Sequence, residues 1–295
     1  MGSDGPRASV IVRTYNRPEM LERAVRSVAA QTWRNLEVVV VNDAGEDVGP
    51  RLDALRPLFE RPEDVVYLNF PPERKPGRCR AASEGIEASS GEWIFYLDDD
   101  DFWYPEHVEV LLAAAAETGA KVLYSDAMQG YEEPVGENGA YVVTSVKDGP
   151  SEDFNRAAFY VGTYIHISTF CHHRSVYDQL GGFDPELLVL EDLDLFFRYA
   201  QAHDFHHVKR FTSQFQIRSD YTNAVTSMKA EFVTTREALC RKYLHTVISD
   251  LLSYVHEGRG RIELTLRELQ ASEARVASLE ARVARLEREL DEARS

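Results

Sequence analysis

The first 125 residues alternate between short hydrophobic runs and segments in which hydrophobic residues recur every three or four positions. Each run is four to six residues long and rich in Val, Ile or aromatic residues, which is typical of a strand. Four consecutive valines in the second run indicate a strand that is covered on both faces. The predicted strands lie at 9–12, 36–41, 65–68, 93–97 and 122–125.

Segments with helical periodicity separate these strands. Asn16 is expected to cap the first helix, with Glu19 completing a capping box, and Pro105 is expected to open another helix. A further helix is predicted at about 79–88. The alternation predicts an α/β fold with a largely parallel sheet and helices on both faces. The hydrophobic face of the first helix comprises Leu21, Ala24, Val25, Val28 and Ala29.

The alternation ends after residue 125. Residues 127–162 are polar and contain several glycines, so they are predicted to form a loop-rich insertion or a hairpin. Regular structure is expected to return at 166–174, and a helix is predicted near 190–202. The predicted folded domain is 1–227, with one half at about 1–125 and the other at about 126–227.

The last part of the chain has a different repeat. Hydrophobic residues recur in heptads, and the segment is rich in Ala, Glu, Arg and Leu, which predicts a coiled coil at 261–295 after a helical linker at 228–260. The alternative is an amphipathic helix packed on its own domain. A coiled coil implies a homo-oligomer, most simply a parallel dimer, or a coiled-coil partner protein. Heptad positions a are Ile262, Leu269, Val276, Val283 and Leu290, and positions d are Thr265, Ser272, Leu279, Leu286 and Ala293.

The composition is that of a globular protein, with 44% hydrophobic and 28% charged residues among 295. A net charge of −16 argues against a nucleic-acid-binding surface. No hydrophobic stretch has the length of a membrane span, and the N-terminal residues do not resemble a signal peptide. Cys79, Cys171 and Cys240 are far apart and odd in number, which favours a reducing compartment. We therefore expect a cytoplasmic protein without a transmembrane segment, either free or peripheral at the inner face of the membrane.

Four consecutive aspartates, residues 98–101, follow the hydrophobic run at 93–97. They are predicted to lie on a turn at the carboxyl end of a strand, where α/β sheets bind ligands. Four adjacent like charges repel one another, and a divalent cation such as Mg²⁺ or Mn²⁺ would remove that cost. The alternative is a solvated acidic turn, since aspartate is common in turns.

Four segments, in this order, resemble glycosyltransferase family 2, a group of inverting enzymes with the GT-A fold that use nucleotide sugars. The first is the opening strand with its loop, and the second is the next strand with Asp43 at its end. The third is the aspartate cluster followed by Pro105, which is similar to the family's metal-binding Asp-x-Asp signature. The fourth resembles the segment with the catalytic base. The segments are 9–17, 31–43, 97–105 and 181–198.

The resemblance implies a nucleotide-binding set. Asp43 would accept a hydrogen bond from the imide of a pyrimidine base, which suits a carboxylate because it is an acceptor-only group. Thr14 and Tyr15 would line the base pocket, with core packing as the alternative for Tyr15. Asp98 would contact the ribose, and Asp99 would belong to the same nucleotide-binding set.

The resemblance also implies the groups that perform the chemistry. Asp100 would hold a Mn²⁺ or Mg²⁺ ion that neutralises the departing diphosphate, which replaces protonation of the leaving group. Asp192 would be the general base that takes the proton from the acceptor hydroxyl. Glu191 and Asp194 are the alternatives for this role, and each could instead be a solvated helix residue.

Two departures from the family pattern leave alternatives open. The family's arginine ahead of the metal-binding strand is missing, so Arg78, Arg80 or Lys75 would supply the positive charge near the phosphates. The family's histidine in the lid segment is replaced by Asp220: either Asp220 ligates the metal, or the ligand is absent, or the lid aligns differently. The last candidates, His166, His172 and His173, are lone histidines of a kind that more often packs than binds metal.

These observations predict a metal-dependent inverting glycosyltransferase. It would move a sugar from a nucleoside diphosphate sugar, with UDP as the nucleotide, to a hydroxyl of a saccharide or glycolipid acceptor. Surface polysaccharide biosynthesis is the setting by family analogy. One alternative, a nucleotidyltransferase that makes sugar nucleotides, would need a glycine-rich first loop, and residues 13–18 contain no glycine. The other, a catalytically inactive coiled-coil scaffold, has no physical need to keep Asp43, Asp100 and Asp192.

Overall fold

The computed structural model describes residues 5–75, 77–135, 140–220, 228, 230–243, 248, 251–256 and 258–259. Contacts divide the chain into two compact units, Met1–His245 and Thr246–Ser295. Helical residues 230–243 belong to the first unit, and the described residues of the second unit are also helical. The coiled coil predicted at 261–295 lies outside the described residues, and the predicted domain end at residue 227 remains a prediction.

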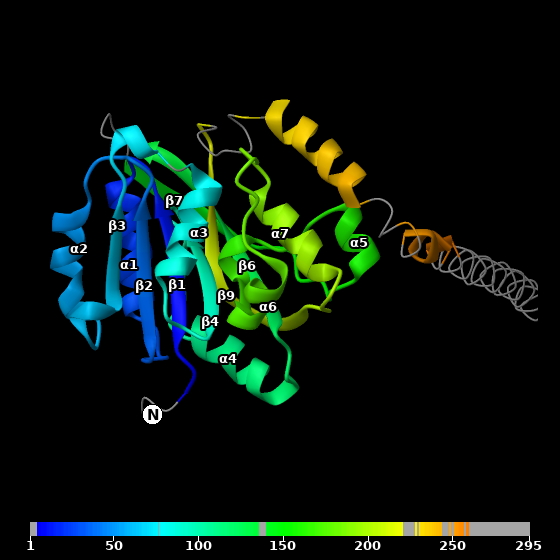
Figure 1. Cartoon of the computed structure of the whole chain (residues 1–295), viewed down its shortest axis with the longest axis horizontal. Coiled ribbons are helices and arrows are strands. Elements are labelled where there is room, and N and C mark those ends of the chain that lie inside the picture. Colours follow the sequence, from blue (N-terminus) through cyan, green and yellow to red (C-terminus); the bar gives the residue numbers. More distant parts are fainter. Residues whose placement is uncertain are drawn as a thin grey trace, which may run out of the picture. The chain divides into compact units, whose positions relative to one another are not determined.

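Within the described residues, one nine-stranded sheet forms the centre of the first unit, in the order β3-β2-β1-β4-β8-β6-β9-β5 with β7 paired to β6 (Figure 1). Strands β3, β2, β1 and β4 are all parallel. Their carboxyl ends therefore meet at one edge of the sheet. This half confirms the sequence prediction: β1 is Ala8–Thr14, β2 Leu36–Asn42, β3 Val65–Asn69 and β4 Trp93–Asp98.

The other half of the sheet is mixed. Strand β8 is antiparallel to β4 and β6, β9 is parallel to β6, and β5 is antiparallel to β9. The expectation of a largely parallel sheet therefore holds for the first four strands and not for the others. The bounds are β5 Phe102–Trp103, β6 Val122–Val135, β7 Ala140–Asp148, β8 Phe170–His173 and β9 His206–Arg218.

The segment after residue 125 contains the hairpin that was one of two predictions for it. Strand β6 continues to Val135 and pairs antiparallel with β7, with a bulge between Tyr131 and Glu132. Helix α5, Arg156–Val161, follows. The loop-rich alternative is wrong for most of the described part of this segment. Strand β7 is largely exposed, and its valines Val142, Val143 and Val146 lie within a polar, glycine-containing stretch, so no strand was predicted there.

Helices cover both faces of the parallel half, as the sequence predicts. Val10 and Val12 share a hydrophobic core with α1, α2 and α4, whereas Ile11, which points to the opposite face, is in contact with α3. Gly85 of α3 permits this contact, because an added Cβ would lie 2.8 Å from Ile11 Cγ2. The helices are α1 Pro18–Ala29, α2 Gly49–Leu55, α3 Arg78–Ala88, α4 His107–Thr118, α6 Arg174–Leu180 and α7 Glu191–Ala200.

The predicted capping box is wrong. Helix α1 has Arg17 at its N-cap, without a side-chain cap, and Pro18 in its first turn. Asn16 instead adopts a positive φ of 54° and accepts a hydrogen bond from Glu46 N at 2.8 Å. The helix predicted after Pro105 is present, but it begins at His107. Among the described residues, no helix combines the length and the hydrophobicity needed to cross a membrane.

Candidate active site

Three parallel strands end at the same edge of the sheet, and each ends at a predicted site residue. Thr14 ends β1, Asp43 directly follows β2, and Asp98 ends β4. Asp43 N donates a hydrogen bond to Thr14 O at 2.9 Å. Ligands of open α/β sheets bind outside the carboxyl ends of the strands. The fold therefore brings the predicted nucleotide-binding residues together.

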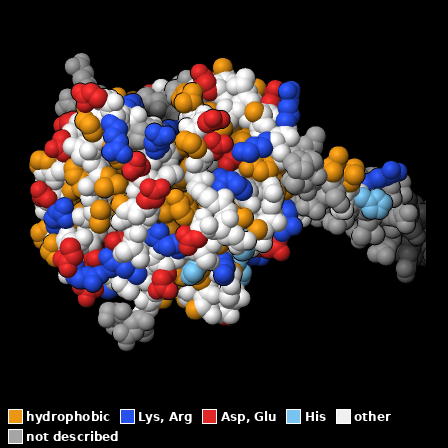
Figure 2. Space-filling model, viewed as in Figure 1, with side chains coloured by type: hydrophobic (Ala, Val, Ile, Leu, Met, Phe, Trp, Pro, Cys, Tyr) orange, Lys and Arg blue, Asp and Glu red, His pale blue; other side chains and the backbone are white. Residues whose placement is uncertain are grey.

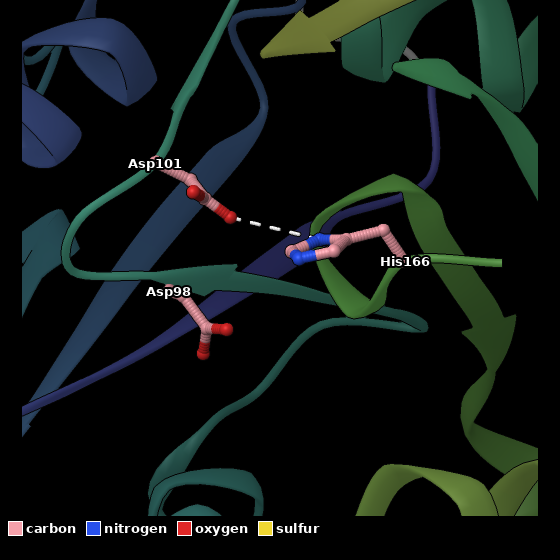
Figure 3. A group of neighbouring side chains, drawn as sticks. All are labelled: Asp98, Asp101 and His166. Carbon is pink, nitrogen blue, oxygen red and sulfur yellow. Dashed lines mark ion pairs between the residues drawn. The ribbon is translucent and has the colours of Figure 1, made fainter. Parts of the chain in front are cut away.

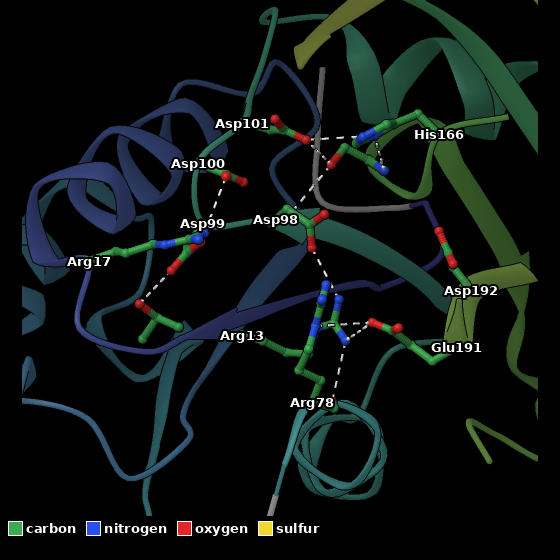
Figure 4. A network of polar contacts seen from close by, with 12 residues as sticks. Arg13, Arg17, Arg78, Asp98, Asp99, Asp100, Asp101, His166, Glu191 and Asp192 are labelled. Carbon is green, nitrogen blue, oxygen red and sulfur yellow. Dashed lines mark hydrogen bonds and ion pairs between the residues drawn. The ribbon is translucent and has the colours of Figure 1, made fainter. Parts of the chain in front are cut away.

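The four aspartates that begin with the last residue of β4 alternate between more and less exposed side chains, and they face a set of arginines (Figure 4). Asp98 and Asp100 keep 28% and 14% of their side-chain surface exposed, whereas Asp99 and Asp101 keep 7% and 3%. The first pair is therefore more open to solvent than the second. This pair has the spacing of the predicted Asp-x-Asp signature.

The two buried aspartates bind other parts of the protein. Thr14 Oγ1 donates to Asp99 Oδ2 at 2.8 Å, and Ser168 Oγ donates to Asp101 Oδ2 at 2.6 Å. Burial and the nearby charge of Asp100 raise the pKa of Asp99 to about 7, and the same causes raise the pKa of Asp101 well above its ordinary value. Asp99, predicted to bind the nucleotide, supports Thr14 in this structure.

Arginine side chains offset part of the negative charge. Arg13 Nη2 lies 3.1 Å from Asp98 Oδ1, Arg17 Nη1 lies 3.2 Å from Asp100 Oδ2, and Arg218 also pairs with Asp100. The sequence argument that the aspartates need a metal ion to offset their repulsion is therefore too strong. The guanidinium groups supply counter-charge within the protein.

The first turn of α7 presents two acidic residues in different surroundings. Arg13 Nη1 and Arg78 Nε lie 2.8 and 3.4 Å from Glu191 Oε1. Burial acts against ionisation of Glu191, but the two arginines outweigh it and lower its pKa. In Figure 4 Asp192 points away from these arginines, and burial together with the charge of Glu191 raises the pKa of Asp192 to about 6. A general base needs such an intermediate pKa, so Asp192 suits this role better than Glu191 does.

The backbone is strained beside the predicted site residues. Leu190, at the N-cap of α7, has a positive φ of 59°, and Ala44, next to Asp43, has one of 63°. Positive φ is uncommon for residues other than glycine, and such strain gathers at functional sites. The strain therefore lies where α7 and β2 present their carboxylates.

The predicted nucleotide pocket has one buried and one open wall. Asp43 is 6% exposed, and its Oδ1 accepts a hydrogen bond from Gly77 N at 2.8 Å. Gly77 has a φ of 79°, which favours glycine. Tyr15 is 46% exposed, so the core-packing alternative for it is wrong. Lys75 Nζ lies 3.7 Å from the centre of the Tyr15 ring, on the surface where a base would stack.

The structure distinguishes the three basic residues that could replace the missing arginine. Arg78 opens α3 and contacts Glu191, and Lys75 lies over Tyr15. Arg80 is exposed and points in a different direction from Arg78, because residues two positions apart lie on different sides of a helix. Arg78 and Lys75 are therefore placed among the site residues. Arg13, which sequence reasoning did not consider, lies between Asp98 and Glu191.

Asp220 lies just after β9 and accepts a hydrogen bond from Tyr141 OH of β7 at 2.6 Å. Arg218, two residues earlier, pairs with Asp100. The end of β9 thus reaches both the aspartates and the β6–β7 hairpin. Metal binding by Asp220 remains a prediction.

Among the described residues, one cluster of two aspartates and a histidine has ligand atoms close enough together to hold a divalent cation (Figure 3). Asp98, Asp101 and His166 each offer a ligand atom, and these atoms lie within 4.8 Å of one another. His166 Nδ1 lies 3.6 Å from Asp101 Oδ2, and burial lowers the pKa of His166. The two carboxylates are ligands of the kind that Mg²⁺ and Mn²⁺ prefer.

The three histidines have different surroundings. His172 is fully buried, its Nε2 lies 2.8 Å from Tyr96 OH, and burial lowers its pKa to about 4, as expected for a packing residue. His173 forms the N-cap of α6. His166 alone among them lies beside the aspartates. Sequence reasoning missed this because no local pattern connects His166 to residues so much earlier in the chain.

Comparison with known proteins agrees with this geometry. The family described as Glycosyl transferase family 2 matches residues 9–180, which is more than half of the chain. The chain belongs to glycosyltransferase family 2. This membership supports the glycosyltransferase prediction over the scaffold and nucleotidyltransferase alternatives, and the protein is a glycosyltransferase.

Relatives in bacteria agree with the family assignment. The uncharacterized glycosyltransferase YwdF of Bacillus subtilis is 33% identical over 203 residues, covering 68% of this chain and 70% of YwdF. The putative colanic acid biosynthesis glycosyl transferase WcaA of Escherichia coli is 28% identical over 200 residues, covering 66% of each chain.

Solved structures of TarS from S. aureus share the fold. One has a TM-score of 0.56 at 18% identity and covers 72% of this chain but 37% of TarS. TarS 1–349 in complex with UDP-GlcNAc has a TM-score of 0.54 at 20% identity, covering 72% of this chain and 59% of that piece. The mixed α/β architecture is consistent with the GT-A fold that the sequence predicts.

Proposed function

We propose that this family 2 member is a metal-dependent inverting glycosyltransferase that moves a sugar from a UDP-sugar to a hydroxyl of a saccharide or glycolipid acceptor. The observation that supports this most is the placement of Asp192. It stands in the first turn of α7 with a pKa raised to about 6, separate from the arginine-bound Glu191. Such a group is ionised at neutral pH and still basic enough to accept a proton.

In this proposal Asp192 takes the proton from the acceptor hydroxyl as its oxygen attacks the anomeric carbon of the donor. The bond from that carbon to the diphosphate breaks on the opposite face, so the configuration inverts. Glu191, held by Arg13 and Arg78, keeps a negative charge beside the base. That charge supports the raised pKa of Asp192.

A divalent cation belongs to the proposal because Asp98, Asp101 and His166 each offer a ligand atom and these atoms lie within 4.8 Å of one another. Asp98 and Asp100 are the two open aspartates of the turn, and carboxylates are the ligands that Mg²⁺ and Mn²⁺ prefer. Following the family resemblance, we propose Asp100 as the main ligand, with His166 and Asp220 as alternatives for completing the site. When bound, the ion would neutralise the departing nucleoside diphosphate.

The nucleotide and the setting are inferred from the pocket and the relatives. Buried Asp43 and open Tyr15 suit a planar pyrimidine base, and TarS 1–349 has been solved with UDP and with UDP-GlcNAc. WcaA is named for colanic acid biosynthesis, which supports surface polysaccharide assembly as the setting. On the face drawn in Figure 2, basic and acidic side chains are interspersed, which does not suggest a nucleic-acid partner.

The decisive experiment compares Asp192→Asn with Glu191→Gln. Asp192→Asn keeps the shape but cannot accept a proton, so transfer should slow by roughly 10²–10⁴-fold while UDP affinity barely changes. The donor is chosen first by thermal shift across nucleotide sugars with Mn²⁺, since a bound ligand stabilises the folded state. If Glu191→Gln abolishes transfer and Asp192→Asn does not, the base is assigned to the wrong residue. NMR of the product's anomeric carbon tests inversion.

A further inference from the structure

Helix α7 is held from its other side by a helical segment that lies outside the family match. Asp194, two residues after the proposed base, is fully buried. Its carboxylate contacts Lys242 and Tyr243, which belong to the helical residues 230–243. The family match ends at residue 180, so the family match alone gives no role to this later helix.

Three donors share the Asp194 carboxylate. Lys242 Nζ and Tyr243 OH donate to Oδ1 at 2.8 and 2.7 Å, and Arg198 Nη2 donates to Oδ2 at 2.7 Å. These contacts outweigh burial and lower the pKa of Asp194. The side chain is therefore occupied, which removes Asp194 as an alternative general base.

The later helix is anchored by few side chains. Leu239 and Tyr243 are 2% and 6% exposed, while most of its other described residues are exposed. The Tyr243 ring lies edge-on to Phe197 of α7, with centroids 5.7 Å apart. The polar contacts to Asp194 thus lie next to the hydrophobic anchor, and both act on α7.

Arg198 extends the same network toward the turn before α7. Its guanidinium donates to the carbonyls of Leu180, Gly181 and Gly182 at 2.8 to 3.0 Å. Asp194 is consequently tied to the later helix on one oxygen and to this turn on the other. If Asp194 moved away from one of these partners, its buried charge would be poorly compensated. The Asp194 side chain is therefore held in place.

We propose that Lys242 and Tyr243 are positioning residues that act through Asp194 to hold the first turn of α7, and with it Asp192, in the orientation needed for transfer. This rests on the proposed role of Asp192 as the base. Asp192 and Asp194 lie in the same turn of α7, so a shift of the backbone at Asp194 also moves Asp192. Leu190 at the start of α7 has a strained positive φ. When the network is lost, the backbone of this turn can change conformation to relieve that strain.

The test uses the full chain with Tyr243→Phe, Lys242→Met, these two combined in a double variant, Lys242→Arg and Arg241→Met. Tyr243→Phe removes one donor and keeps the ring on Phe197, and Lys242→Met removes the charge. Arg241→Met is the matched control, because Arg241 is exposed on the same helix. Lys242→Arg tests rescue by a second cation. The measured quantities are kcat, donor KM, UDP affinity and the thermal midpoint.

We expect kcat of the Tyr243→Phe, Lys242→Met double variant to fall by about tenfold, since small misplacements of reacting groups slow catalysis strongly. Donor KM and UDP affinity should stay near wild type, Arg241→Met should be unchanged, and Lys242→Arg should recover most of kcat. Wild-type kcat in the double variant, or a loss explained by a lower folded fraction alone, would overturn the proposal. If Asp192→Asn itself keeps full activity, the proposed base and this inference both fail. A dead Asp192→Asn with a fully active double variant sinks only the inference.

Discussion

Arg17 and Arg218 hold the carboxylate of Asp100 between them, and the Arg218 side chain is 1% exposed. A carboxylate predicted to bind metal therefore already has cationic neighbours in the protein. Charge repulsion among four aspartates would suggest that removing one stabilises the fold. The observed pairs suggest the opposite, because the buried Arg218 guanidinium would lose one anionic partner.

We therefore expect Asp100→Ala to abolish transfer and to destabilise the protein by about 1–3 kcal/mol. Activity of the wild type should vanish with EDTA and return with Mn²⁺ or Mg²⁺. Thermal unfolding without metal measures the stability, with exposed Asp148→Ala as the control. A higher melting temperature for Asp100→Ala would show that repulsion dominates, and full activity in excess EDTA would remove the metal from the mechanism.

The pKa of Asp192 predicts how transfer activity falls at acidic pH. Its pKa is raised to about 6 by burial and by Glu191, with Asp98 adding to the rise and Arg78 opposing it. A base acts when deprotonated, so kcat/KM should be full above this pKa and fall as the pH drops through about 6.

Glu191→Gln should move the acid limb of this profile to lower pH. It removes a negative charge beside Asp192 and leaves Arg78 without its carboxylate partner, and both changes favour the ionised base. The comparison is made on kcat/KM over about pH 4.5 to 8, which extends to both sides of the Asp192 pKa of about 6. A limb that stays in place or moves upward would mean that another group limits the rate.

At the scale of elements, burial explains which strands could be predicted. Strands β1, β2 and β4 are covered on both faces, so their sequences are continuous hydrophobic runs that are easy to recognise. Strand β7 is largely exposed, and its short valine-containing run was hidden within a polar, glycine-containing stretch. The capping role of Asn16 failed because its side chain binds Glu46 N, a contact set by the tertiary fold.

Site residues that belong to a sequence motif could be predicted. Contacts between residues far apart in the sequence could not. Asp43, the aspartate turn and Asp192 follow from the family resemblance. The pairs of Arg13 with Asp98 and Glu191 join three separate elements, and His166 reaches Asp101 from yet another. No local periodicity encodes such contacts, because they depend on how the strands and α7 are arranged in space.

The contact of α3 with the sheet predicts the effect of Gly85→Ala. An added Cβ would lie 2.8 Å from Ile11 Cγ2 and 3.0 Å from Val41 Cγ2, both on buried β-branched side chains. We expect a loss of about 1–3 kcal/mol from overpacking, although alanine favours a helix over glycine by about 1 kcal/mol. Urea unfolding measures it, with Gly162→Ala as the control, since a Cβ there meets nothing within 4 Å. Equal or greater stability of Gly85→Ala would mean that α3 can move away from the sheet.

At the scale of the whole molecule, the heptads predict a parallel dimer through residues 261–295. Val at a and Leu at d favour two strands, and attractive g–e′ pairs favour the parallel orientation. Each exposed pair contributes only about 0.3–0.5 kcal/mol, so the pairs select orientation more than they add affinity. The predicted pairs are Arg275 with Glu280, Arg282 with Glu287, and Glu289 with Arg294.

Sedimentation of the full chain and of a chain ending at Glu257 tests this dimer. We expect the full chain to be dimeric at micromolar concentration and the shortened chain to be a monomer that still hydrolyses the donor. The shortened chain keeps every proposed site residue, including Lys242 and Tyr243. A monomeric full chain would refute the dimer and leave the glycosyltransferase activity untouched.

Arg13 has a consequence for building hybrid enzymes. Its guanidinium joins Asp98 of β4 to Glu191 of α7, so one side chain connects the part proposed to bind the donor with the part that presents the base. A hybrid that takes residues after 125 from a relative without an acid at position 191 would leave this arginine half-compensated, and removing one partner of a buried ion pair is costly. When acceptor specificity is exchanged between family members, the residues at positions 13, 98 and 191 should therefore be taken together from the same parent enzyme.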